Sequence, residues 1–206
     1  VRTRRFQREF RLTMPGLFNV ENALAAIAVC QGLNIPEQAV YVGLMKARVP
    51  GRMEVYSNAD DTVTAIVDYA HNRMSFETLF RSVQAEYPGR RIVTVFGCGG
   101  NRDRAKRPLM GEAVARLSDV AVLTSDNPRH EEPEAIMADV MPGLSGAAEV
   151  FADPDRRRAI ERGLELLHPG DALLIAGKGH ESTQQIGDVK HPFSDQQTVR
   201  EILGCA

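Results

Sequence analysis

The sequence contains little cysteine and almost no net charge. Its three cysteines, Cys30, Cys98 and Cys205, are far apart, and their odd number and spacing match neither a disulfide framework nor a zinc site. We therefore expect a reducing, cytoplasmic setting and no metal site. The net charge of −2 provides no broad positive field, so we expect neither nucleic acid nor a membrane as a partner.

Long apolar runs and a recognisable leader are also missing. No apolar run approaches the roughly 20 residues that a transmembrane helix needs. Residues 1–12 are rich in arginine, which argues against a signal peptide. The remaining composition, 43% hydrophobic and 25% charged, is typical of a soluble globular protein. A chain of 206 residues suffices for one ordinary domain or one and a half.

The first part of the chain has the pattern of an incomplete unit. The sequence predicts an edge strand, or the end of one, over 4–13, a helix over 19–33 and a second helix from Pro36. About 50 residues of this kind are too few to bury a core alone, and the chain lacks an initiator methionine. We expect residues 1–51 to be the tail of a larger domain whose front precedes Val1, with exposed apolar helix faces.

From Gly51 onward, apolar runs of strand length alternate with amphipathic segments of helix length. We expect strands over 53–56, 63–67, 91–96, 120–124, 149–151, 172–176 and briefly at 185–186. We expect helices over 75–87, 105–117, from Pro133 to about 140, over 154–167 and over 196–203. Strands that alternate with helices predict an α/β fold with a mostly parallel sheet covered on both faces.

Polar loops follow several of these strands. They cover residues 68–71, 97–104, 126–129 and 177–181. If the strands are parallel, the loops meet at one edge of the sheet, which is where open α/β sheets bind ligands. They would bring together Arg102 and Arg129, whose planar guanidinium groups suit a carboxylate or phosphate, and the acid Glu181.

Each loop also has a plainer interpretation. Asp126 could cap the next helix and Arg129 could be a solvated surface charge, which is the commoner role of such turns. The GCGG run lacks GxGxxG spacing, so it supports a dinucleotide site only weakly. His71 and His180 lack partners at metal-ligand spacing. The sequence predicts a solvated helix start at Arg104, Lys106 and Arg107. Lys178 could contact a phosphate, but it is expected to be a solvated loop residue.

Six stretches, in this order and spacing, resemble the Mur ligase family: GLFNVENALAA, PGRMEVY, VDYAHN, VFGCGGNRDRAKRPLMGE, SDNPR and GKGHE. The resemblance covers nearly the whole chain, and within the family it is to the ligases that add the third residue of the peptidoglycan stem peptide. It implies that residues 52–206 form a Rossmann-like C-terminal domain that brings the incoming amino acid. Residues 1–51 would end the central P-loop ATPase domain, although the P-loop pattern GxxxxGK[ST] is absent from this sequence.

The resemblance also implies an ATP-dependent amide-bond ligase. ATP phosphorylates the D-glutamate carboxylate of UDP-MurNAc-L-Ala-D-Glu, and the amine of the third amino acid attacks the acyl phosphate. Such chemistry needs Mg²⁺ to neutralise the phosphates. Most of the catalytic groups would precede Val1, so we expect these 206 residues to recognise the amino acid and part of ATP without turning ATP over.

Family members with the quartet DNPR usually add meso-diaminopimelate. By resemblance its receptors are Arg102, Asp126, Asn127, Pro128, Arg129, Gly177 and Glu181. Diaminopimelate differs from lysine by a carboxylate on its far carbon, so its second zwitterionic end calls for an arginine and an acid. A site built to bond a group can reject an analogue lacking it by about 10⁴–10⁵. We therefore predict diaminopimelate rather than L-lysine, which stays the alternative substrate.

For ATP, the resemblance implies Asn19 and Asn22 near the adenine, Arg52 near the phosphates and Asp68 near the ribose. Asn19 could equally be an ordinary helix N-cap. The chain departs from the family just after DYAH, where Asn72-Arg73-Met74 stands in place of a proline and an acid. An alternative of another class is a non-catalytic module that binds an amino acid.

Overall fold

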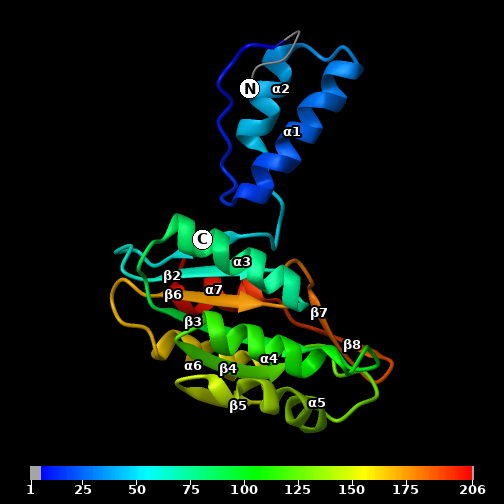
Figure 1. Cartoon of the computed structure of the whole chain (residues 1–206), viewed down its shortest axis with the longest axis vertical. Coiled ribbons are helices and arrows are strands. Elements are labelled where there is room, and N and C mark those ends of the chain that lie inside the picture. Colours follow the sequence, from blue (N-terminus) through cyan, green and yellow to red (C-terminus); the bar gives the residue numbers. More distant parts are fainter. Residues whose placement is uncertain (1–5, 206) are drawn as a thin grey trace. The chain divides into compact units, whose positions relative to one another are not determined.

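The computed structural model describes residues 6–205 and divides the chain into two compact units (Figure 1). The first unit ends at Val49 and the second begins at Pro50. None of the described helices combines the length and apolar character that crossing a membrane requires.

The first unit is a pair of helices, α1 (Leu17–Gly32) and α2 (Glu37–Lys46). Their small core is made of Phe6, Ile27 and Val40. The predicted strand over 4–13 is wrong for residues 6–13, which contain only an isolated bridge; residues 4 and 5 lie outside the described part. This segment packs on helices instead, because Phe6 joins their core and Arg8 stacks 3.7 Å from the centre of the Tyr41 ring.

The first unit leaves part of its apolar surface uncovered, as the sequence predicts. Leu17, Leu24 and Val29 of α1 are 72%, 46% and 61% exposed. A helix buries its apolar face only when a partner covers it. Within the described residues of this unit, no element covers these three side chains of α1.

The second unit is built on a six-stranded sheet with the order β1-β2-β6-β3-β4-β5. The strands are β1 (Glu54–Ser57), β2 (Thr64–Asp68), β3 (Ile92–Cys98), β4 (Val120–Ser125), β5 (Val150–Asp153) and β6 (Ala172–Ala176). Only β1 runs antiparallel to its neighbour, and β2 to β6 pair in parallel. The mostly parallel α/β sheet predicted from the sequence is therefore confirmed.

Helices cover both faces of this sheet (Figure 1). One face carries α3 (Arg73–Glu86), α4 (Lys106–Leu117) and α5 (Pro133–Val140), followed by a 3₁₀ turn, η1 (Met141–Gly146), that the sequence did not predict. The other face carries α6 (Arg156–Glu165) and α7 (Asp195–Leu203). Side chains of β3 alternate between the two layers: Val93 and Val95 pack toward α6, whereas the Phe96 ring meets Phe76 of α3 at 5.9 Å between centroids.

A two-stranded hairpin, β7 (Thr183–Ile186) and β8 (Val189–Pro192), follows the sheet. The sequence predicted only part of β7, because β8 is exposed throughout and has no apolar pattern to reveal it. The hairpin is joined to the loop after β4 by main-chain bonds. Arg129 N donates to Gln185 O (3.0 Å), and Gly187 N donates to Arg129 O (2.6 Å).

Candidate functional site

A cleft of about 190 Å³ lies at the carboxyl ends of β2, β6, β3 and β4. These strands are parallel neighbours, so their loops share one edge of the sheet, as the sequence predicts. Of the predicted diaminopimelate receptors, all but Pro128 line the cleft; Pro128 lines a neighbouring cavity. The lining residues are Tyr69, His71, Gly97, Cys98, Gly99, Arg102, Lys106, Met110, Asp126, Asn127, Arg129, Gly177 and Glu181.

Two arginines flank the glycine-rich loop on one side of the cleft. A methyl group added at Gly99 would lie 3.0 Å from Arg129 Nη1 and 3.7 Å from Arg102 Cγ. Arg102 is exposed, whereas Arg129 is half-buried and donates through Nη1 to Gly100 O (2.7 Å). The interpretation of Arg129 as a solvated surface charge is therefore wrong. Its remaining N–H groups can serve an anion, since a guanidinium carries five donors.

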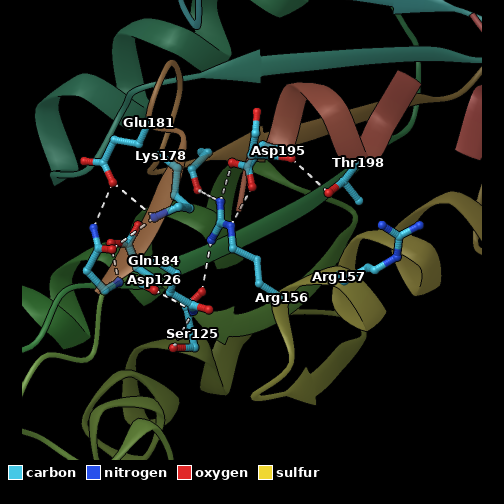
Figure 2. Close-up of polar contacts among 12 residues, drawn as sticks. Ser125, Asp126, Arg156, Arg157, Lys178, Glu181, Gln184, Asp195 and Thr198 are labelled. Atoms are coloured by element: carbon cyan, nitrogen blue, oxygen red, sulfur yellow. Dashed lines mark hydrogen bonds and ion pairs between the residues drawn. The ribbon is translucent and has the colours of Figure 1, made fainter. Parts of the chain in front are cut away.

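The cleft is also lined by a carboxylate, that of Glu181, which accepts hydrogen bonds from two donors (Figure 2). Glu181 Oε2 accepts from Asn127 Nδ2 (2.8 Å) and from Lys178 Nζ (3.1 Å). Burial opposes the charge, but these donors and the nearby cations hold the pKa of Glu181 below its usual value. Glu181 is therefore ionised at neutral pH and can receive an ammonium group.

Lys178 is fully buried, so the expectation that it is a solvated loop residue is wrong. Its Nζ bonds both Glu181 and Asn127 Oδ1 (3.1 Å). The same Asn127 oxygen accepts from Gln185 N (2.9 Å). These bonds fix the Asn127 amide and, through it, the orientation of the Glu181 carboxylate.

The loops after β4 and β6 touch at Asp126 and Gly177. Asp126 Oδ1 accepts from the neighbouring Asn127 N (2.6 Å), and α5 is capped at Glu132, so the predicted alternative of Asp126 as a helix cap is wrong. Gly177 has φ +119°, which favours glycine. A methyl group there would lie 2.8 Å from Asp126 Oδ2. The cleft walls thus meet where a side chain has no room.

The glycine-rich run after β3 also brings two backbone segments close together. Gly100 N donates to Asn127 O (2.9 Å), and a methyl group at Gly100 would lie 1.8 Å from Pro128 O. Only glycine allows the two backbones to come this close. The run therefore docks one cleft loop on another, which explains its presence without a dinucleotide.

A buried arginine ties the start of α4 to α5 and to the residue that precedes its N-cap. Arg107 is fully buried, so its expected place in a solvated helix start is wrong. It donates to both Glu131 oxygens (2.8 and 2.9 Å) and to Asp139 Oδ2 (2.8 Å). The Arg107 hydrogen bonds lower the pKa of Glu131 to about 2. Two other residues were predicted to be solvated. Arg104 is exposed, as predicted, whereas Lys106 is half-buried and lines the cleft.

Neither a reactive thiol nor a metal cluster is found in this region. Burial raises the pKa of Cys98 to about 12, and its thiol lies against Met110 Sδ, so it is no thiolate nucleophile. Residues 6–205 hold no group of three His, Cys, Asp or Glu side chains placed to bind a metal. The departure at Asn72 has a structural explanation, because Asn72 and Ser75 form a capping box that begins α3.

The predicted ATP residues are split between the two units. In the second unit, Arg52 is exposed, and its guanidinium carbon lies 4.8 Å from the centre of the Tyr69 ring. Asp68 is buried, and its oxygens accept from Met53 N and Ala70 N, each at 2.8 Å. Burial raises the pKa of Asp68 despite these bonds.

In the first unit, Asn19 is buried and donates to Pro15 O (2.7 Å), whereas Asn22 is exposed. Gly16 is the N-cap of α1, so Asn19 is not an N-cap. The two asparagines lie about one helical turn apart in α1.

The parallel sheet, with arginines and an acid converging at its carboxyl edge, defines an open α/β domain of the class that binds ligands at that edge. Residues 51–179 match the family model described as the Mur ligase, glutamate ligase domain, and the chain belongs to the Mur ligase family. Tyr69 and Lys178 stand in loops that the sequence predicts at this edge, but Tyr69 was given no role there and Lys178 was expected to be solvated. Arg107 was not predicted to shape the site at all, because its acidic partners lie far away in the sequence.

Named relatives are similar over nearly the whole chain. A UDP-N-acetylmuramoyl-L-alanyl-D-glutamate–2,6-diaminopimelate ligase of Lawsonia intracellularis is 53% identical over 92% of this chain and 39% of its own length. That of Aquifex aeolicus is 45% identical over 95% of this chain and 40% of its own. A solved structure of a ligase with this name has a TM-score of 0.70 at 39% identity, covering 95% of this chain and 40% of its own. The chain thus spans about two fifths of these relatives.

Proposed function

We propose that this chain is the amino-acid-binding end of an ATP-dependent ligase that adds meso-diaminopimelate to UDP-MurNAc-L-Ala-D-Glu in cytoplasmic peptidoglycan synthesis. The relatives that match nearly all of it carry the name of that ligase. The observation that carries the proposal is the placement of Arg102, Arg129 and Glu181 around one cleft.

The cleft offers what the far end of diaminopimelate requires. Arg129 is preoriented, because Gly100 O holds one guanidinium nitrogen and the hairpin holds its main chain. Glu181 is preoriented by Asn127 and Lys178. A carboxylate can bind the arginine while the ammonium group on the same carbon binds Glu181. L-lysine has the ammonium group but no carboxylate there, so it would leave the arginine unpartnered.

ATP supplies the phosphoryl group that activates the acceptor carboxylate. Arg52 fits a phosphate, because its guanidinium is exposed beside Tyr69. Asp68 fits a ribose less readily, since it is 4% exposed and both oxygens already accept main-chain N–H groups. We assign Asp68 the role of anchoring the backbone that carries Arg52. The described residues contain no acid cluster for Mg²⁺, so its ligands would come from elsewhere in the ligase.

Calorimetric titration with meso-diaminopimelate and with L-lysine tests the substrate. We expect binding of diaminopimelate only, weakened at least 100-fold by Arg129→Ala, because a charge-assisted bidentate contact is worth about 1.5–3 kcal/mol per bond. Arg158→Ala, at an exposed arginine of α6 that does not line the cleft, serves as the control and should change nothing. Equal or tighter binding of L-lysine would refute the diaminopimelate assignment in favour of the L-lysine alternative.

An ATPase assay addresses the alternative of a binding module. We expect residues 1–206 alone to bind the amino acid without hydrolysing ATP, because the GxxxxGK[ST] pattern is absent from them. ATP hydrolysis that persists after repurification would contradict the claim that these residues bind the amino acid without hydrolysing ATP. The same chain within a full-length ligase should support ligation of diaminopimelate, which a mere binding module would not do.

A further inference from the structure

Arg156 is a fully buried arginine that does not line the cleft but joins three elements behind it (Figure 2). Its Nε and Nη2 donate to the two oxygens of Asp195 at 2.7 and 2.8 Å. Its Nη1 donates to Ser125 O (3.2 Å), and Nη2 also donates to Ala176 O (3.0 Å). One guanidinium therefore connects the first residue of α7 to the last residues of β4 and β6.

Those two strands are not neighbours, because β3 lies between them in the sheet. No ladder hydrogen bond can therefore fix the distance between their ends. Arg156 bridges that gap with two separate N–H groups, one for each carbonyl. The planar guanidinium sets the spacing of the two carbonyl groups.

The helix itself gives no reason for a buried cation at this position. Arg156 is the first residue of α6, where the helix dipole disfavours positive charge. Burying a charge is also costly unless it is paired and fully hydrogen-bonded. Burial pushes the pKa of Arg156 down, yet the charges of Asp195, Asp126 and Glu181 outweigh it, so the pKa lies above its ordinary value. A residue that breaks local rules in this way points to a role elsewhere.

The bridged carbonyls immediately precede the two walls of the cleft. Ser125 is followed by Asp126, and Ala176 is followed by Gly177. A methyl group placed on Gly177 would lie 3.8 Å from Arg156 Nη2 and 2.8 Å from Asp126 Oδ2. Arg156 therefore lies beside the contact between Asp126 and Gly177.

We propose that Arg156 and Asp195 form a positioning pair that sets the separation of the loops 126–129 and 177–181, so that α7 shapes a cleft it does not line. The identity of the ligand, meso-diaminopimelate, rests on the proposed function. The positioning of the loops does not, because it follows from the carbonyls that Arg156 bridges.

A lysine cannot reproduce these contacts. Arg156→Lys keeps the charge opposite Asp195, but its single ammonium group cannot reach two carbonyls and a carboxylate in the places they occupy. Arg91→Lys is a matched control at the opposite edge of the sheet. Arg91 Nη1 also pairs with an aspartate, Asp171 Oδ2 (2.7 Å), and also donates to a carbonyl, Leu166 O (3.0 Å).

Amide hydrogen exchange of the parent chain and both lysine variants, with titration of meso-diaminopimelate, tests the proposal. In Arg156→Lys we expect amides of 126–129 and 177–181 to exchange at least tenfold faster, with α3 and β1 within about twofold of the parent. We expect about tenfold weaker binding of diaminopimelate in this variant. Arg91→Lys should leave both loops and the affinity unchanged. Asp195→Asn, which keeps one acceptor for Arg156, should give a smaller change at the same two loops.

Two outcomes would overturn the proposal: unchanged exchange in both loops of Arg156→Lys, or a uniform increase that Arg91→Lys shares. Should Arg156→Lys fail to fold, Asp195→Asn decides by the same exchange criterion. A parent chain that does not bind diaminopimelate would count against the proposed function alone. The exchange pattern would still decide whether the pair positions the loops.

Discussion

The ion pairs of Arg107 provide a direct test of how the cleft loops are held. We consider Arg107→Met, which keeps an unbranched side chain of similar length and removes the charge and all donors. In the protein, Arg107 bonds Glu131 through two nitrogens and Asp139 through one of them. The variant leaves Glu131 without its arginine, whereas Asp139 keeps the exposed Arg104 as a partner.

The structure sets the size of the expected effect. Removing one partner of a buried ion pair costs about 3–5 kcal/mol. The side chains of Glu131 and Asp139 remain 23% and 30% exposed, so water can replace part of the lost interaction. We therefore expect a loss of about 2–3 kcal/mol. In a domain of this size that corresponds to a fall in Tm of about 5–10 °C.

The effect should depend on pH in a defined direction. The pKa of Glu131 is lowered by Arg107 from an ordinary 4.5 to about 2. A carboxyl group with a depressed pKa in the folded state stabilises the protein above its unfolded pKa and loses this contribution as pH falls. The contribution is thus complete above about pH 4.5 and disappears toward pH 2. Arg107→Met should therefore differ most from the parent near neutral pH and least near pH 2.

Urea unfolding followed by circular dichroism, at pH 7 and at acid pH, measures both effects. Arg116→Met is the matched control, because Arg116 lies on the same helix and pairs with Glu77 at the surface. Exposed pairs contribute about 0–1 kcal/mol. The reasoning is refuted if Arg107→Met loses no more stability than this control, or if it keeps the acid dependence of the parent.

The remaining predictions concern close packing at the cleft. Gly100→Ala puts a methyl group 1.8 Å from Pro128 O, so we expect at least tenfold weaker binding of diaminopimelate by calorimetry, whereas Gly146→Ala, with open space around it, should bind normally. Equal affinities would contradict the docking of the loops. Iodoacetamide at pH 8 should label the two half-buried cysteines of the folded chain but not Cys98, whose pKa is raised to about 12. Mass spectrometry counts the labels, and rapid labelling of Cys98 would show that the cleft floor opens.

The sheet and the meeting of its loops were predictable from short-range patterns. Apolar runs such as Arg91–Phe96 gave the strands, and their alternation with helices gave parallel pairing. Parallel pairing in turn placed Arg102, Arg129 and Glu181 at one edge. The strand β8 was missed because it is exposed and has no apolar pattern. The segment 6–13 was wrongly predicted as a strand, because its strand-like alternation packs on helices instead.

Buried charges could not be predicted, because their partners lie far away in the sequence. Arg107 stands in a run of basic residues that looks solvated, and its acids follow 24 and 32 residues later. Lys178 pairs with the nearby Glu181, but it also donates to Asn127, which lies 51 residues earlier. Arg156 meets Asp195 39 residues later, on another helix. The sequence around a charged residue does not show whether water or a protein partner will surround it. Only the tertiary structure distinguishes an exposed charge from a buried, paired one.

The hairpin β7–β8 attaches to Arg129 through main-chain atoms alone, at Gln185 O and Gly187 N. The side chains of β8 are exposed and take no part in that attachment. Neutral drift can therefore exchange them freely without disturbing the arginine. An insertion or deletion of one residue in the hairpin has the opposite effect, because it shifts the ladder and turns Arg129 away from the cleft. We therefore expect this hairpin to tolerate substitutions in β8 but not a change in its length.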